Sequence, residues 1–441
     1  MVKTEKLAEV LDTIRLHSDP PPDLFRRFQE QYRDLPPEEK LRFFDFILRR
    51  MEIQKGEIEE PVRGLLTADS DDPAEWSRVL TTLRRRMESP RLRAFRRFVS
   101  VSGGFKFLLD FRADLLAMRR QTTLDLEPLD EELSYLFNTW FQSGFLFLQE
   151  ITRDSSFRQI RFLKEHEMVH PMASLEEIWN RLGNDRRCFA LYHRAMPEEP
   201  VVFIEAALTR GIARSIHAIL QAGDQGTAAR PDTAVFYSIN NTQDGLIGLG
   251  LARILIFGVV DAIKTSQPGI KTFCTLSPIP GFWQRYLKPI LEGNCGSFAI
   301  SPERFKNCFS EKAQTALIEH HAQTARNGKQ DLSAVLLEIL PALEWIDDPV
   351  YANLLRWPLT ELTYFYITKE KDRRGRPLDP VANFHMNNGA RVSFENINFG
   401  ANRSERGHEE SCGMMVNYVY TKTWLQQMGS TMRSLLKRNG R

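Results

Sequence analysis

A strand-like segment followed by closely spaced glycines lies near the middle of this 441-residue chain. The glycines are Gly245, Gly248 and Gly250. Residues 234–240 are rich in β-branched and aromatic side chains, which predicts a buried strand. Apolar residues then recur at three- and four-residue steps over 246–263, which predicts a helix that begins in or just after the glycines. Gly269 is typical of a helix stop, and 270–276 predicts a second strand.

The glycine turn has the properties of a diphosphate-binding site. A helix start presents unpaired N–H groups and a partial positive charge, and glycine lets a phosphate approach the backbone without meeting a Cβ atom. The residues expected to contact such a ligand are Gln243, Asp244, Gly245, Leu246 and Gly248. No Gly-Lys-Ser/Thr follows, and the glycine spacing does not fit the dinucleotide fingerprint. The alternative is that the glycines only allow a helix to pack closely against a sheet.

Two histidine-containing stretches are also candidates for chemistry. Polar residues surround His385 in the segment 379–390, which predicts a loop that is either a surface turn or a site. The sequence from His166 to His170 matches the zinc-protease pattern HExxH, which needs both histidines on one helix face and a third ligand. Pro171 favours an extended conformation at His170, the flanking residues favour strand, and no third ligand stands out. We therefore interpret this match as chance and expect no metal.

Several separated motifs resemble those of one enzyme family. The turn Gln243-x-Gly-x-x-Gly is similar to the acyl-CoA diphosphate loop of GNAT-type acyltransferases. The other motifs are Leu276-Ser-Pro-Ile-Pro-Gly-Phe282, Asp379-Pro-Val-Ala-Asn-Phe-His-Met-Asn-Asn-Gly-Ala390, Ser411-Cys-Gly-Met-Met-Val-Asn-Tyr418, Phe236-Tyr-Ser-Ile239 and Val169-His-Pro171. Together they resemble the malonyl-CoA decarboxylase family, in order, from about Val169 to Tyr420.

The resemblance implies decarboxylation of malonyl-CoA to acetyl-CoA and CO2. The intermediate enolate needs hydrogen-bond donors at its oxygen and a proton at the α-carbon, and histidine suits the latter near neutral pH. The thioester itself accepts the electrons, so we expect no metal, biotin, thiamine or other cofactor. The resemblance implies catalytic roles for Ser277, which would orient the malonyl carboxylate or relay a proton, and for His385 as the proton donor. Tyr418 would add a supporting hydrogen bond, while Asn383 and Asn387 would orient the histidine.

One position departs from the family and two alternative functions stay open. Some relatives carry a glutamate where this chain has Gly250, so that carboxylate's role is absent here or belongs to another residue. The first alternative is a GNAT-type acyltransferase that passes an acyl group from CoA to an amine. The second is a non-catalytic acyl-CoA sensor.

The elements that position these residues predict an α+β protein of two domains. Residues 1–153 show helical periodicity and predict an all-α helical bundle, which the resemblance implies serves self-association as a dimer or tetramer. Residues 154–441 predict a GNAT-like mixed β-sheet catalytic domain with helical insertions, including one over 294–340. Strands at 188–192 and 201–208 flank a hairpin signal at 196–200.

Composition limits the partners and the compartment. The formal net charge is only +2, so we expect neither nucleic acid nor membrane as a partner, and we interpret the arginines near residues 84–97 as a solvated face or a subunit contact. The five cysteines are an odd number without close pairing, which favours free thiols in the cytoplasm.

Overall fold

The computed structural model describes residues 3–17, 19–221, 230–325, 331–421 and 423. The chain divides into two compact units. The first comprises residues 1–147, 192–201 and 241–251, and the second comprises 148–191, 202–240 and 252–441. The first unit therefore includes the predicted glycine turn, although this turn is distant in sequence from the helices of that unit.

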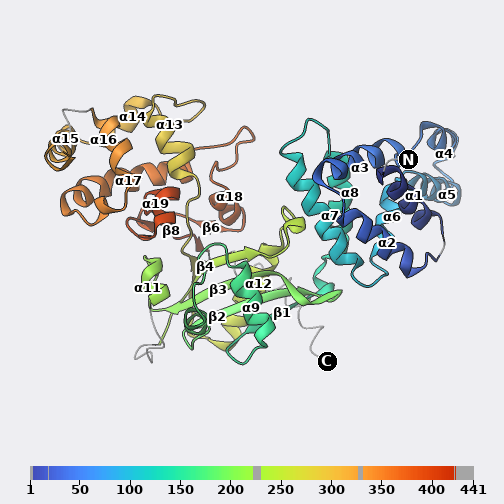
Figure 1. The fold of residues 1–441 in the computed structure, drawn as a ribbon, viewed down its shortest axis with the longest axis horizontal. Helices are drawn as coiled ribbons and strands as arrows, with labels where there is room; N and C mark the ends of the chain where they lie inside the picture. Colours follow the sequence, from blue (N-terminus) through green and yellow to red (C-terminus); the bar gives the residue numbers. More distant parts are fainter. Residues whose placement is uncertain (1–2, 18, 222–229, 326–330, 422, 424–441) are drawn as a thin grey trace. The chain divides into compact units, whose positions relative to one another are not determined.

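Residues 3–140 of the first unit form helices, as the sequence predicts (Figure 1). They are α1 (Lys3–Leu16), α2 (Pro22–Arg33), α3 (Pro37–Arg50), α4 (Lys55–Thr67), α5 (Pro73–Arg86), α6 (Pro90–Phe98), α7 (Gly104–Arg119) and α8 (Glu127–Trp140). Buried aromatic rings form its core: Tyr32 of α2 lies 4.9 Å from Phe111 of α7, measured between ring centroids, and Phe28 lies 5.7 Å from Phe107. Such rings contribute large apolar areas to the core.

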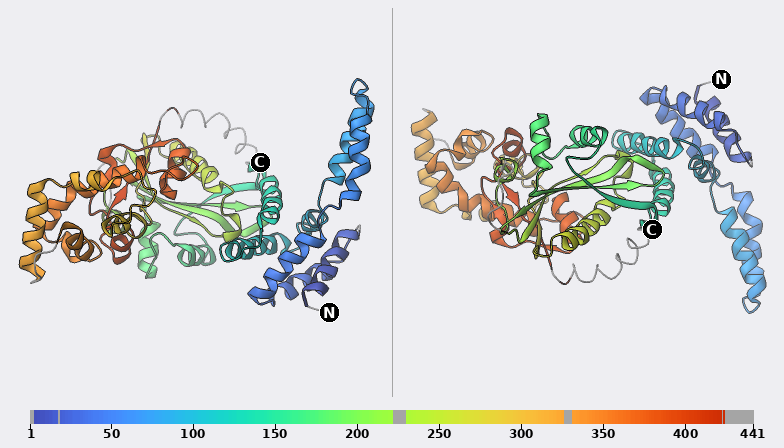
Figure 2. Two further views of the ribbon diagram at one scale, coloured as in Figure 1. Left: turned by 90° about the horizontal axis from the view of Figure 1, so that it is seen from above. Right: turned by 90° about the horizontal axis from the view of Figure 1, so that it is seen from below.

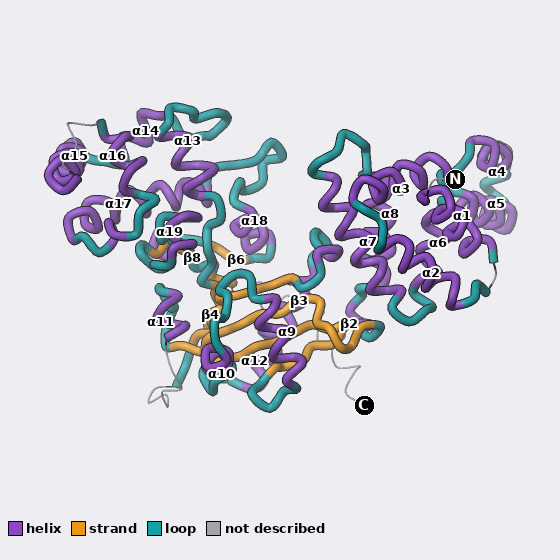
Figure 3. The backbone as a smooth tube through the Cα atoms, viewed as in Figure 1, coloured by secondary structure: helices purple, strands orange, loops and turns teal. Residues whose placement is uncertain are grey.

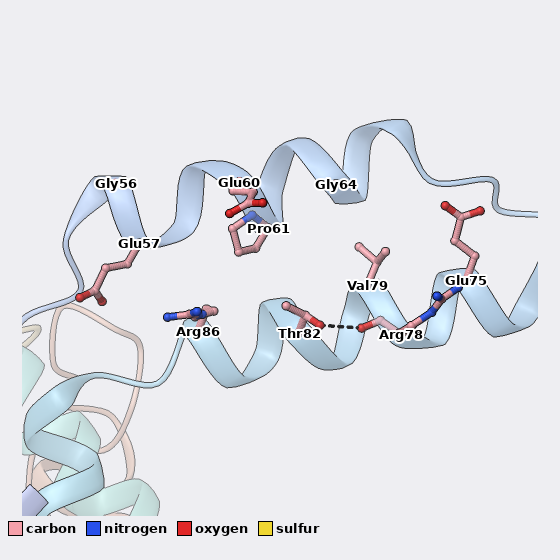
Figure 4. Close-up of a pocket in the computed structure, with 10 residues that line it drawn as sticks. All are labelled: Gly56, Glu57, Glu60, Pro61, Gly64, Glu75, Arg78, Val79, Thr82 and Arg86. Atoms are coloured by element: carbon pink, nitrogen blue, oxygen red, sulfur yellow. Dashed lines mark hydrogen bonds between the residues drawn. The ribbon is translucent and has the colours of Figure 1, made fainter. Parts of the chain in front are cut away.

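The pair α4 and α5 differs from the rest of this unit. Neither helix has a buried residue. Asp72 caps α5 by accepting hydrogen bonds from two backbone N–H groups, and Pro73 follows it at the start of the helix. Figure 4 shows the groove between the two helices, whose lining includes Glu57, Glu60, Arg78 and Arg86.

Among the described residues, the second unit contains most of a mixed sheet of seven strands in the order β1-β2-β3-β4-β5-β9-β6. Figure 3 shows the strands in orange. The strands are β1 (Leu146–Ile151), β2 (Arg186–His193), β3 (Met196–Thr209), β4 (Thr233–Asn241), β5 (Thr272–Thr275), β6 (Ala390–Arg391) and β9 (Val419–Tyr420). Strands β4 and β5 are parallel, whereas β5 and β9 are antiparallel. The predicted mixed sheet is confirmed.

Helices cover this sheet and extend beyond it. They are α9 (Phe157–His166), α10 (Leu175–Arg181), α11 (Ile216–Gln221), α12 (Leu251–Ser266), α13 (Lys288–Leu291), α14 (Pro302–Asn307), α15 (Glu311–Ala325), α16 (Leu332–Ile339), α17 (Pro349–Thr368), α18 (Pro380–Asn387) and α19 (Glu405–Ser411). Helix α12 lies along one face of the sheet, and α9 and α10 lie on the other (Figure 2). The helical insertion predicted over 294–340 is confirmed by α14, α15 and α16.

Several local predictions are confirmed and others are wrong. Strand β4, helix α12 and strand β5 follow one another as predicted for the glycine turn and its flanks. The segment 146–149, predicted as helix, begins strand β1, and residues 161–163, predicted as strand, lie in α9. The hairpin turn falls at residues 194–195, so 196–200 belong to β3. Among the described residues, no helix combines the length and the apolar character that a bilayer crossing requires.

Candidate active site

Ser277 follows β5 and is held by backbone pairing. Its N–H donates to the carbonyl of Val416 at 2.9 Å, and the N–H of Val416 donates back at 3.0 Å. The serine is 6 % exposed. It is therefore a buried side chain at the end of a central strand, where ligands dock in sheets of this kind, and not a surface turn before a proline.

His385 lies in the last turn of α18, so the prediction of a loop at 379–390 is wrong. Asp379 caps this helix by accepting the N–H of Ala382 at 2.6 Å, and Pro380 occupies the first helical position. The same Asp-Pro signal begins α5, so the sequence did carry the evidence for a helix. His385 is 4 % exposed, which places its imidazole inside the protein.

The structure brings Ser277, His385 and Tyr418 together. The serine Oγ lies 3.4 Å from Nε2 of His385. The ring of Tyr418 stacks on the imidazole with centroids 4.8 Å apart and planes inclined by 26°. The hydroxyl of Tyr418 is buried and has no hydrogen-bond partner among the described residues. In this structure Tyr418 therefore contacts the histidine through its ring.

Two residues that the sequence analysis missed complete the arrangement. The hydroxyl of Tyr420 lies 2.9 Å from Nδ1 of His385, and both tyrosines lie on one face because alternate residues of a strand share a face. Ser277 donates to the hydroxyl oxygen of Thr275 at 2.9 Å, and that oxygen also accepts the N–H of Tyr418 at 3.1 Å. Thr275 lies two positions before Ser277, and Tyr420 lies two positions after Tyr418. This two-residue spacing was the signal in the sequence that could have identified them.

These hydrogen bonds define one consistent protonation pattern. Because the serine hydroxyl donates to Thr275, its oxygen accepts from His385, which places a proton on Nε2. Nδ1 then accepts from Tyr420, whose pKa is raised by burial, so the phenol keeps its proton. Burial lowers the pKa of His385 to about 3, so the imidazole is neutral near pH 7.

The predicted asparagines do not contact the histidine. Nδ2 of Asn387 donates to Oδ1 of Asn383 at 2.8 Å. Each lies two positions from His385, which places it on the opposite side of the helix. The orientation of the imidazole comes from Tyr420 instead, and a substrate contact by either asparagine stays a prediction.

The glycine turn has a geometry of its own within the first unit. Gln243 precedes a short 3₁₀ helix (Asp244–Leu246), and α12 begins at Leu251. Gly248 and Gly250 have φ angles of 86° and 70°, a left-handed conformation that favours glycine, and space around them is open.

Gly245 has a different role. A Cβ atom there would lie 2.1 Å from the carbonyl oxygen of Leu109 on α7. The packing interpretation therefore accounts for Gly245, although its partner is a helix of the first unit and not the sheet. It does not account for Gly248 or Gly250, where an added Cβ atom would meet no other atom within 4 Å.

The HExxH match does not form a zinc site. Helix α9 ends at His166, so the two histidines do not share a helix. Glu167 accepts the N–H groups of Val169 and His170 with one carboxylate oxygen, and Ser238 donates to the other. Over the described residues, no cluster of three side chains suited to a metal occurs.

The fold and the site define a protein with a helical N-terminal part and a mixed β-sheet that carries a buried serine–histidine pair. Residues 55–141 match the family model of the malonyl-CoA decarboxylase N-terminal domain, and residues 144–430 match that of its C-terminal domain. The chain belongs to the malonyl-CoA decarboxylase family.

Individual relatives agree with this assignment. The chain is 34 % identical over 339 residues to "Malonyl-CoA decarboxylase, mitochondrial" of Anser anser anser, covering 75 % of this chain and 64 % of that protein. It is 32 % identical over 354 residues to the Rattus norvegicus protein of the same name, covering 79 % and 68 %. The crystal structure of malonyl-CoA decarboxylase from Rhodopseudomonas palustris superimposes with a TM-score of 0.77 at 28 % identity, covering 100 % of this chain and 98 % of that one. That from Agrobacterium vitis gives 0.77 at 28 %, covering 99 % and 100 %.

Proposed function

We propose that this protein decarboxylates malonyl-CoA to acetyl-CoA and CO2. The observation that carries the proposal is the buried pair of Ser277 and His385, held by Tyr420 and stacked on Tyr418. Family membership supports the substrate, because the relatives are named for this reaction.

In the proposed reaction His385 supplies the proton. The malonyl carboxylate brings a negative charge into a buried site, where it favours a protonated imidazole. The C–C bond breaks as CO2 leaves, and its electron pair passes to the thioester as an enolate. The α-carbon then takes the proton from Nε2, and the histidine returns to its neutral form. One proton from solvent is consumed per turnover.

Ser277 stands next to the proton that is transferred. Its hydroxyl contacts Nε2 of His385 and Thr275, so it can turn to donate to the malonyl carboxylate or pass the proton on. The two roles differ in their kinetics. Loss of carboxylate binding in Ser277→Ala would raise KM, whereas loss of a relay would lower kcat with KM unchanged.

The glycine turn is proposed to bind the CoA diphosphate. Its support is local: Gly248 and Gly250 adopt left-handed conformations in open space just before α12, where amides can face a phosphate. Gln243, Asp244 and Leu246 lie in the same turn, where Gln243 donates to Glu199 at 3.3 Å.

The test is turnover of malonyl-CoA with no acyl acceptor present. We expect CO2 release by the wild-type protein and losses of about 10²–10⁴-fold in kcat for His385→Asn, the usual contribution of a general acid. His320→Asn is the matched control, because this histidine lies in the helical insertion and pairs with Asp348. Release of free CoA thiol without CO2, and only with an amine present, would favour an acyltransferase. Tight CoA binding without turnover would favour a sensor. A His385→Asn variant with normal rates would remove that residue as the acid.

Self-association and compartment stay as proposals. We propose that the helical first unit mediates a dimer or tetramer, supported by α4 and α5, where Leu66 is 80 % exposed and no residue is buried. Light scattering of the full chain and of Leu66→Glu would test this, and an unchanged mass would contradict it. The five free cysteines fit the reducing cytoplasm, but the curated relatives are named mitochondrial, so cell fractionation must decide.

A further inference from the structure

A buried arginine of the helical domain is bonded to the glycine turn. Arg112 of α7 is 3 % exposed. Its Nε donates to Asp130 at 2.7 Å, and its Nη1 donates to the carbonyl oxygens of Gly245 at 2.5 Å and Ile247 at 3.1 Å. All of these residues belong to the first unit. A guanidinium offers five donors in a rigid plane, which suits it to hold a carboxylate and two carbonyl groups at once.

These bonds determine which side of the turn is available to a ligand. In a trans peptide the C=O and the following N–H point in opposite directions. Because Arg112 holds the carbonyl of Ile247, the N–H of Gly248 is directed away from the arginine. In the part of the chain that the structure describes, the N–H groups of Gly248 and Gly250 make no hydrogen bond. The carbonyl groups of the turn thus have a hydrogen-bond partner in Arg112, and the N–H groups of Gly248 and Gly250 are available to an anion.

The backbone of α7 supports the same turn. Gly245 approaches the carbonyl of Leu109 so closely that no side chain fits between them. The N–H of Leu246, whose peptide also faces Arg112, donates within the turn to Gln243 at 2.9 Å. The turn therefore has a fixed conformation before any ligand arrives, and preorganisation of this kind favours binding.

We infer that Arg112 is a positioning residue for CoA binding: it fixes the carbonyl side of the glycine turn so that its amides face the diphosphate. This inference rests on the proposed diphosphate-binding role of the turn. The effect is one of geometry and not of net charge, because Asp130 accepts from Arg112 and from Arg119, and Glu127 also pairs with Arg119.

The test compares two substrates in Arg112→Lys, which keeps the charge but not the planar fork. We expect kcat/KM for malonyl-CoA to fall by about tenfold or more, which corresponds to loss of one charge-assisted hydrogen bond. For malonyl-pantetheine, which has no diphosphate, kcat/KM should stay within about twofold of wild type. A general loss of structure would lower both values together, so the substrate difference separates positioning from folding.

Arg91→Lys is the matched control. Arg91 is 2 % exposed, pairs with Glu132 and Glu52 in the same unit, and contacts backbone carbonyls of α3 and Met51, not the glycine turn. It should affect both substrates equally. If Arg112→Lys fails to fold, Asp130→Asn, which weakens the anchor of the Arg112 guanidinium and also the pairing with Arg119, should show the same substrate difference at smaller size.

The outcomes distinguish the inference from the function on which it rests. If the wild-type protein does not turn over malonyl-CoA, the proposed function fails. If it does, and neither Arg112→Lys nor Asp130→Asn affects malonyl-CoA more than malonyl-pantetheine, the inference is overturned.

Discussion

The neutral His385 predicts that malonyl-CoA binding changes its protonation. Both ring nitrogens contact hydroxyl groups, and burial lowers the pKa to about 3, so only about one molecule in 10⁴ carries an imidazolium at pH 7. A carboxylate about 4 Å away stabilises a charged imidazole by about 4 kcal/mol at an effective dielectric constant of 20. That energy corresponds to about three pKa units, so the pKa in the complex should be near 6.

Proton uptake on binding is the direct measurement. If Ser277→Ala lowers kcat, calorimetry of this variant in buffers of different ionisation enthalpy should show uptake of about half a proton per malonyl-CoA at pH 6, and almost none for acetyl-CoA, which has no carboxylate. In the wild-type protein kcat should fall as the pH rises above about 6, approaching tenfold per unit, because the protonated fraction falls. Equal proton uptake with both ligands, or a kcat that does not change from pH 6 to 9, would refute the reasoning.

Three further predictions concern single residues. Tyr420→Phe removes the hydroxyl at Nδ1 of His385 and should lower kcat by about tenfold or more. The control Tyr351→Phe, which removes a hydroxyl 3.0 Å from His321, should leave kcat unchanged. Nitrogen NMR of the His385 imidazole would show whether its tautomer has shifted. Gly245→Ala should destabilise the protein by about 3 kcal/mol in a denaturant titration, because the new Cβ meets backbone; a loss below about 1 kcal/mol would contradict the packing. The pKa of His385 in the folded protein lies below its unfolded value near 6.5, so the contribution of the neutral imidazole to stability is present above pH 6.5 and is lost as the pH falls towards 3, by up to about 5 kcal/mol. His385→Asn lacks this titrating group, so its free energy of unfolding should fall less in acid than that of the wild-type protein. Identical acid transitions of the two proteins would argue against a buried neutral imidazole.

The sequence predicted the elements of the site better than their contacts. The strand, turn, helix and strand around the glycines follow from residue periodicity and glycine positions, and Ser277 and His385 follow from motifs that lie 108 positions apart yet meet in the fold. Strand β1 was missed because 146–149 continue an aromatic-rich segment whose periodicity favours helix, and only pairing with β2 reveals its extended form.

The parts that could not be predicted depend on contacts between distant segments. Nothing in the sequence near Gly245 indicates that its neighbour is Leu109, because a glycine required for packing and one required for a turn look alike. The hydroxyl of Tyr420 was recognisable only as the second residue on the face that Tyr418 occupies. Glu167 was predicted only as part of a chance motif. In the structure its carboxylate accepts hydrogen bonds from the N–H groups of Val169 and His170 and from the hydroxyl of Ser238.

The close approach of α7 to the glycine turn affects how this protein can be dissected. The two family models meet between residues 141 and 144, which suggests a natural place to separate the halves for expression. A fragment that begins there would lack both Leu109 and Arg112, and would leave the carbonyl groups of Gly245 and Ile247 to water. Given the proposed role of the turn in CoA binding, the smallest piece that keeps the CoA affinity of the full chain should extend upstream to include α7 and the acidic side chain of Asp130 on α8.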